Sequence, residues 1–183
     1  MKKLILITMV TVTMNVVALA QSKMVSKDGS VNFFSHTVAE DISSNNYTLT
    51  STIDPSTGAV VFIVPMQGFE FEISMMQKHF NSNKFLDTKA FPKGKFVGNI
   101  TNIKDVKFGT DGVYNAKVVG ELTLHGVTKT IETTGTISVA GGVSTVDSKF
   151  QLTLADFEIA FEKGKPSTNV AKSVDVTVKS VFK

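Results

Sequence analysis

From about residue 30 onward, apolar and polar residues alternate along the chain, which is the pattern of β-strands with one buried face. The alternation is clearest in the second half, in the segments 114–124, 127–139, 146–154 and 174–182. Short turn sequences separate the first three of these segments, at His125-Gly126 and at Gly141-Gly142. In the first half, a turn at 54–58 joins two strand-like segments, 47–53 and 59–64. Long strands joined by short turns predict an antiparallel meander.

One stretch departs from this period of two. Ser74 could cap a short helix in which Met75, Met76, His79 and Phe80 share one face at a spacing near 3.6 residues. We therefore expect residues 74–90 to form a helical insert across one opening of the sheet. About eight strands with one apolar face can close into a barrel or stack as a sandwich, and periodicity alone does not choose between the two. Closure would remove the exposed sheet edges that favour aggregation.

The first twenty residues have the pattern of a secretory signal peptide. Lys2 and Lys3 precede an apolar run over 4–17, and the small residues Ala18-Leu19-Ala20 predict cleavage before Gln21. The apolar run is short for a transmembrane anchor and is interrupted by Thr and Asn residues. We therefore expect export to the periplasm, or secretion, and a single mature domain over 21–183.

The composition argues against a nucleic-acid partner. All 19 basic residues are lysine, and without Lys2 and Lys3 the mature chain has 17 lysines against 16 acidic residues. Arginine is the usual bidentate ligand of phosphate and guanine, and the chain has none. There is no Cys and no Trp, but there are 14 Phe. Because Phe brings apolar area without a polar group, this excess predicts a dry interior.

No pattern in the sequence predicts a catalytic site, so we expect a binding protein rather than an enzyme. His36, His79 and His125 are each isolated, and without Cys a zinc site would need all three to converge. There is no Gly-x-Ser-x-Gly nucleophile elbow. Glu70 and Glu72, two residues apart on one strand face, are typical of a solvated surface. We accordingly predict neither a metal nor a resident cofactor.

Three motifs resemble those of the YceI-like, polyisoprenoid-binding family. The segment 120–129, Gly-Glu-Leu-Thr-Leu-His-Gly-Val-Thr-Lys, is similar to that family's Gly-x-Leu-Thr-Leu-x-Gly-Val-Thr-Lys. The stretch from His79 to Phe96, which includes Phe91-Pro92, resembles an earlier Phe-rich block, and Asp156-Phe157-Glu158-Ile159 resembles a late element. Leu154 replaces an Arg that is common in the family, which indicates a divergent branch.

The resemblance implies an all-β fold, an antiparallel lipocalin-like barrel of about eight strands with the helical insert near one opening. It also implies an exported protein that holds an isoprenoid quinone or polyprenyl lipid in the barrel. On this interpretation Met and Phe side chains of the insert would line an adaptable mouth. The lumen-lining residues are predicted to be Phe69, Phe71, Met75, Met76, Phe80, Phe85, Phe96, Leu122, Leu124, Phe150 and Leu152.

Two other functions fit the same alternation. The first is a structural or adhesive β-domain whose core is solid and holds no ligand. The second is an outer-membrane β-barrel, although such barrels carry girdles of Trp and Tyr, and this chain has no Trp and two Tyr. We therefore predict an apolar lipid as the partner and no stable membrane insertion. A homodimer is left open.

Overall fold

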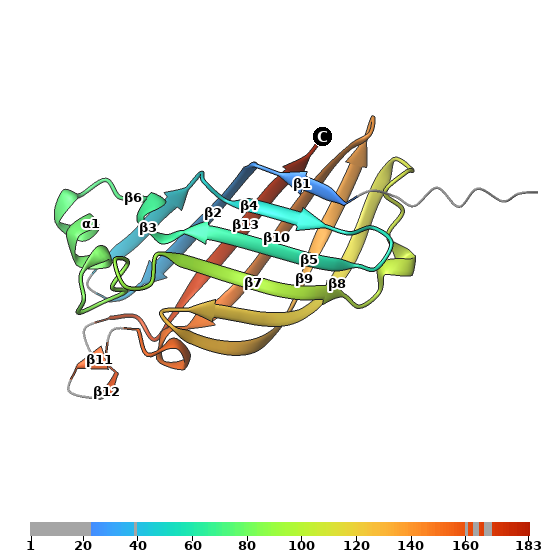
Figure 1. Ribbon diagram of the computed structural model, residues 1–183. Helices are drawn as coiled ribbons and strands as arrows, with labels where there is room; N and C mark the ends of the chain where they lie inside the picture. The colour runs from blue at the N-terminus through green and yellow to red at the C-terminus, as the bar shows by residue number, and fades with distance from the viewer. Residues whose placement is uncertain (1–22, 39, 160, 163–164, 167–169) are drawn as a thin grey trace, which may run out of the picture.

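The computed structural model describes residues 23–38, 40–159, 161–162, 165–166 and 170–183. Its main feature is an antiparallel sheet of eleven strands in the order β1-β4-β5-β7-β8-β9-β10-β13-β2-β3-β6, which curls into a barrel (Figure 1). The strands are β1 (Met24–Ser26), β2 (Asp28–His36), β3 (Asp41–Asn46), β4 (Thr50–Ile53), β5 (Ala59–Pro65), β6 (Phe69–Glu70), β7 (Lys93–Ile100), β8 (Gly112–Leu124), β9 (Val127–Ala140), β10 (Val143–Thr153) and β13 (Ser173–Phe182). Strands β11 (Phe161–Glu162) and β12 (Lys165–Pro166) form a separate pair.

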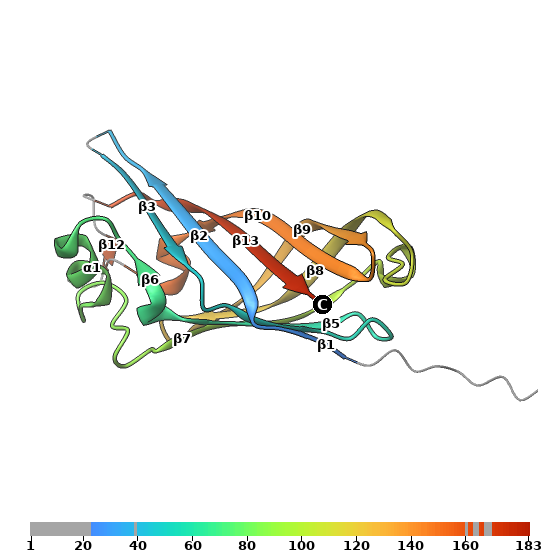
Figure 2. The ribbon, with the colours of Figure 1, turned by 90° about the horizontal axis from the view of Figure 1, so that it is seen from above.

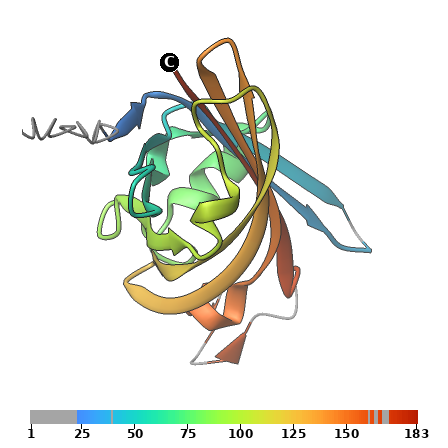
Figure 3. The same ribbon diagram turned by 90° about the vertical axis from the view of Figure 1, so that its right-hand side faces the viewer.

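The barrel closes because its first strand is bent. Strands β1 and β2 are separated by Lys27 alone; β1 pairs with β4, whereas β2 pairs with β13. This one segment therefore joins the two ends of the meander, as the view along the barrel shows (Figure 3). Across the closure, the buried hydroxyls of Ser51 and Ser180 lie 2.6 Å apart and share a hydrogen bond.

A second bend separates β3 from β4, and Asn46 stabilises it. The side chain of Asn46 is fully buried, and its Nδ2 donates to the carbonyl of Pro65 at 2.8 Å. Its Oδ1 accepts from the amide and the hydroxyl of Thr48, at 2.8 and 2.7 Å. Backbone groups that leave the sheet at the bend thus keep a partner. If β1 and β2 are counted as one bent strand, β3 and β4 as another, and the two-residue β6 is left out, the sheet has eight strands.

The prediction of an all-β antiparallel barrel is therefore confirmed, although the strand count differs. The predicted inward faces are also observed: in β8, for example, Ala116, Val118, Leu122 and Leu124 face the interior. The pairing of β9 with β10 stops at Gly135 and Ser148, so the remainders of these strands diverge. The 3-10 helix η3 (Leu154–Phe157) packs against β9 there, with Leu154 and Phe157 buried.

The helical insert is shorter than predicted. Helix α1 spans Ser74–Asn81 and lies at one end of the barrel (Figure 2). Ser74 begins this helix but does not cap it, because the cap position is Ile73 and makes no side-chain hydrogen bond. After Asn81 the chain continues in turns, with Asp87 at a left-handed φ of 40°. No helix in the described part of the chain is long and apolar enough to cross a membrane.

Two clusters of buried side chains occupy the two ends of the barrel. The cluster near α1 includes Leu49, Phe69, Phe80, Leu152 and Phe157. The cluster at the other end includes Ile53, Val60, Ile100, Phe108, Ile137 and Phe182. Partly buried Phe62 packs against both clusters. The interior between the two clusters is incompletely filled by side chains and contains the candidate site.

Candidate functional site

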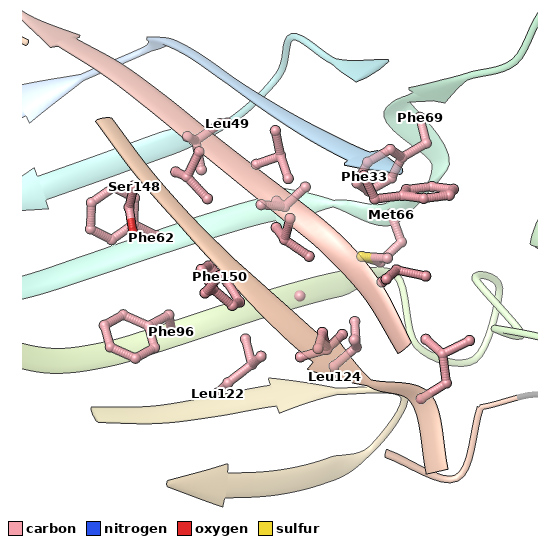
Figure 4. Close-up of a pocket in the computed structure, with 18 of the residues that line it drawn as sticks. Phe33, Leu49, Phe62, Met66, Phe69, Phe96, Leu122, Leu124, Ser148 and Phe150 are labelled. Carbon is pink, nitrogen blue, oxygen red and sulfur yellow. The ribbon is translucent and has the colours of Figure 1, made fainter. Parts of the chain in front are cut away.

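A cavity of about 620 Å³ lies inside the barrel. Its wall is built from the inward-facing positions of the strands, so that side chains at every second residue point into it (Figure 4). The labelled residues Leu49, Phe62, Phe96, Leu122 and Phe150 come from the bend before β4 and from strands β5, β7, β8 and β10, and they converge on this space. Most of the lining is aliphatic or aromatic, which suits an apolar occupant.

One end of the cavity is closed. The side chains that line it there are Ile53, Val60, Ile100, Ala116 and Ile137, and each is at most 3% exposed. Behind them, Phe182 and Val139 are buried without lining the cavity, and they complete the packed core that closes this end of the barrel. The rings of Phe62 and Phe96, with centroids 6.5 Å apart, stand on the cavity wall near this end (Figure 4).

The other end is formed by α1 and a cluster of five phenylalanines. The ring of Phe80 stacks on Phe33, with centroids 5.7 Å apart and an interplanar angle of 7°. It also contacts Phe69, Phe71 and Phe85, with centroids 5.3, 5.0 and 6.3 Å away. Aromatic pairs at such separations are favourable beyond the area they bury. This cluster attaches the helix to the barrel and forms the cavity wall beneath it.

Polar side chains line the cavity mainly at this helical end, which we call the mouth. The polar residues that line the mouth are Thr37, Glu40, His79, Ser82 and Lys84. Three of them, Glu40, His79 and Lys84, are exposed. The mouth therefore offers hydrogen-bonding groups of both charges in contact with water. The five apolar side chains named at the closed end offer none, so the cavity has one largely polar and one largely apolar end.

A second, smaller polar patch lies on the wall where β9 and β10 diverge. The hydroxyl of Ser148 donates to the carbonyl of Thr134 at 2.8 Å and lies 3.4 Å from the hydroxyl of Thr133. Ser148 thus satisfies a backbone group at the point where strand pairing ends. Because its proton is donated within the wall, this hydroxyl can only accept a hydrogen bond from a ligand.

A family model described as the YceI-like domain matches residues 12–182. The chain belongs to the YceI-like family. The resemblance inferred from the three sequence motifs is therefore confirmed.

Relatives and solved structures agree with this membership. The UPF0312 protein of Pseudomonas putida strain W619 is 34% identical over 110 residues, which are 57% of this chain and 52% of the relative. The UPF0312 protein of Pseudomonas syringae pv. tomato is 36% identical over 118 residues, 58% of this chain and 53% of the relative. The YceI-like chain thus spans about half the length of the curated relatives it matches.

Among solved structures, BcnA of Burkholderia cenocepacia has a TM-score of 0.70 at 19% identity, over 85% of this chain and 96% of that one. A protein of Saccharophagus degradans, described as a polyisoprenoid binding domain implicated in plant cell wall breakdown, has a TM-score of 0.72 at 13% identity. That match covers 88% of this chain and 97% of the other. At these identities the likeness establishes the shared fold.

The structure brings together ten of the eleven residues predicted to line the lumen. They come from the insert, from its flanks and from four strands: Phe69, Phe71, Met76, Phe80, Phe85, Phe96, Leu122, Leu124, Phe150 and Leu152. Met75 is an exception: it is 61% exposed and does not line the cavity, so its assignment to the mouth is corrected. It lies one position from Met76, about 100° round the helix, on the side turned to solvent. A role of the ten in ligand binding stays a prediction.

Sequence reasoning missed part of the wall. Phe33, Leu49, Phe62 and Met66 line the cavity and were not predicted to do so. The signal for Phe62 was present in the sequence, because it alternates with Val60 and Val64 in the strand-like segment 59–64. Leu49 and Met66 stand beside a bend and in a short 3-10 helix, where no period of two applies.

The three histidines do not meet. His36 Nδ1 lies 2.5 Å from the carboxylate of Asp41 on an exposed hairpin, and His125 Nδ1 lies 3.1 Å from the carbonyl of Phe157. His79 lies at the mouth. In the described residues, no three His, Asp or Glu side chains are grouped so that they could hold a metal ion. Glu70 and Glu72 are exposed, as their spacing suggested.

Proposed function

We propose that this YceI-like protein is an exported binding protein that holds a long apolar lipid, of the isoprenoid type, in the lumen of its barrel. It would carry, store or sequester this lipid in the periplasm or outside the cell. The observation that carries the proposal is the cavity of about 620 Å³, which is apolar along its wall, closed at one end and polar at the other.

The energetics support an apolar occupant. Burial of each CH₂ group contributes about 0.8 kcal/mol, so a hydrocarbon tail needs no charged partner in order to bind tightly. The protein's own side chains also gain, because atoms that face an empty space lack dispersion contacts on that side. The Saccharophagus degradans protein that shares this fold is described as a polyisoprenoid binding domain, which supports an isoprenoid here.

The same wall supports binding without catalysis. On the wall where β9 and β10 diverge, the hydroxyls of Ser148 and Thr133 are hydrogen-bonded to each other and to the backbone. A tail held there would contact chiefly aliphatic and aromatic carbon. Export is supported by the signal-peptide pattern of residues 1–20, which lie outside the described residues.

The test is to express the full chain in a bacterium and to recover it from the periplasmic fraction. The mass of the recovered chain should correspond to cleavage before Gln21. Organic extraction followed by mass spectrometry should then yield a prenyl lipid in near-stoichiometric amount. Repeated empty extracts would favour the ligand-free structural domain, and carbonate-resistant association with membranes would favour an outer-membrane barrel.

A matched pair of variants on β8 ties the lipid to the lumen. Leu122→Gln places a polar side chain on the cavity wall, whereas Glu121→Gln changes the neighbouring residue on the outer face. The lipid content should fall in the first variant and stay unchanged in the second. Circular dichroism of both shows whether the fold is kept. Equal lipid in two folded variants would contradict binding inside the barrel.

A further inference from the structure

We propose that the lumen accommodates about four isoprene units of a methyl-branched tail, inserted tail first, and that any further units and the head group lie at or beyond the mouth. This inference rests on the function proposed above and adds the size and the orientation of the isoprenoid ligand. It follows from two independent dimensions of the cavity, its volume and its length.

The volume sets the number of atoms. The cavity measures about 620 Å³, and a water-sized group occupies about 30 Å³. The quotient is about twenty groups of the size of a methylene or methyl. A tail of about twenty carbon atoms would therefore fill the lumen.

The length is given by the strands that line the cavity. On β8 the lining residues run from Ala116 to Leu124, a separation of eight residues along the strand. At about 3.3 Å per residue and a tilt of about 40° to the barrel axis, this stretch spans roughly 20 Å along the axis. An extended carbon chain with bonds of about 1.5 Å advances roughly 1.3 Å per carbon, so about sixteen carbons fit in line.

The two dimensions together fit a branched tail better than a linear one. The volume holds about four more carbons than the length allows in a single line. One methyl branch on every fourth main-chain carbon supplies these atoms, and that is the isoprene pattern. A linear chain of sixteen carbons would leave about a fifth of the space empty, with a loss of contacts along the wall. A linear chain of twenty carbons would extend beyond the mouth.

The distribution of polar groups sets the orientation. The side chains Ile53, Val60, Ile100, Ala116 and Ile137 at the closed end are apolar and at most 3% exposed, so a polar head group placed among them would be surrounded mainly by carbon. Such burial is costly. At the mouth, by contrast, Glu40, His79 and Lys84 are exposed to water. The tail therefore enters first and the head group stays among these side chains.

The experiment uses the delipidated mature chain and a ladder of prenyl alcohols with ten, fifteen, twenty, twenty-five and thirty carbons. Affinity is measured by displacement of a fluorescent polyene fatty acid, and native mass spectrometry confirms one ligand per chain. Each methylene that enters the lumen should strengthen binding by about fourfold. We expect a steep rise up to twenty carbons and then a plateau. Linear alcohols of sixteen and twenty carbons should bind at least about tenfold more weakly than the branched twenty-carbon alcohol.

Two variants move the plateau in opposite directions. Ala116→Leu adds three carbons at the closed end and should shift the plateau toward fifteen carbons. Phe62→Ala removes a ring from the wall and should shift it toward twenty-five. Ala59→Leu is the matched control, because Ala59 is exposed and lies outside the cavity; its plateau should stay at twenty.

The outcomes separate this inference from the proposed function. Affinity that rises steadily through thirty carbons, or a plateau that neither folded variant moves, would overturn the size assignment while leaving lipid binding intact. Linear and branched tails that bind equally well would overturn the isoprenoid class of ligand in the proposed function, while leaving the size assignment intact. If no alcohol of any length displaces the probe, the proposed function itself fails.

Discussion

Replacement of Phe80 by alanine should detach helix α1 from the barrel while leaving most of the barrel folded. Phe80 is 5% exposed and is the side chain through which α1 enters the core. Its ring contacts Phe33, Phe69 and Phe71, with centroids between 5.0 and 5.7 Å away. The rest of the helix is exposed or half-buried, so its attachment depends largely on this ring.

The magnitude follows from the area that the ring buries. A buried phenylalanine removes about 150–200 Å² from water, which at about 25 cal/mol per Å² amounts to roughly 4–5 kcal/mol. Truncation of buried phenylalanines to alanine costs about 3–5 kcal/mol, in agreement with this figure. An isolated helix of eight residues is not stable in water. Without the ring, α1 should therefore unfold locally.

Hydrogen exchange measured by mass spectrometry tests this prediction. A loss of about 4 kcal/mol in the free energy of local opening corresponds to exchange up to about a thousandfold faster. This acceleration should be confined to peptides that cover α1, whereas peptides from β8 and β9 should keep most of their protection. The region around Phe33 should show a smaller change, because it loses one stacking partner.

The control is Met75→Ala on the same helix. Met75 is 61% exposed, and its replacement by alanine changes the helix propensity little. This variant should exchange as the wild type does. Two results would refute the reasoning. One is a Phe80→Ala protein whose α1 stays protected; the other is a loss of protection that is equal in α1 and in β8.

Three further predictions concern the mouth, the bend and an exposed turn. Met76→Glu puts a charge on the cavity wall beneath a half-exposed helix, so lipid uptake should fall while the thermal unfolding temperature stays nearly unchanged; equal lipid content in variant and wild type would count against the assignment. Asn46→Ala should lower the free energy of unfolding in urea by about 1–3 kcal/mol, because it leaves a part-buried carbonyl and a part-buried amide without partners; a change below about 1 kcal/mol would contradict this interpretation of the bend. The hydroxyl of Ser56 lowers the pKa of the Asp54 carboxyl below its ordinary value of 3.8. Ser56→Ala should raise the pKa of Asp54 in an NMR titration. Any loss in the free energy of unfolding should be present above the ordinary pKa of the carboxyl and should disappear as the pH falls through the pKa of Asp54 in the folded protein. An unchanged titration would exclude the hydroxyl as the cause.

Much of the wall could be predicted because it depends on local periodicity. In β8, β10 and β13 the residues predicted to face inward do so, since a strand places every second side chain on the same face whatever lies opposite. The helical insert was predicted for the same reason, although its end was not. Asp87 adopts a left-handed backbone conformation that no period of hydrophobic residues indicates.

The sequence by itself therefore determined the strand faces, the apolar character of the interior and, through three motifs, the family. The tertiary structure alone decided that the sheet closes, because closure depends on the bends that let one segment pair with β4 and with β13. It also decided that Met75 faces solvent and that about 620 Å³ stays unfilled. An internal volume is the difference between the space that all the strands enclose and the space that all the side chains fill, so no single segment of the sequence encodes it.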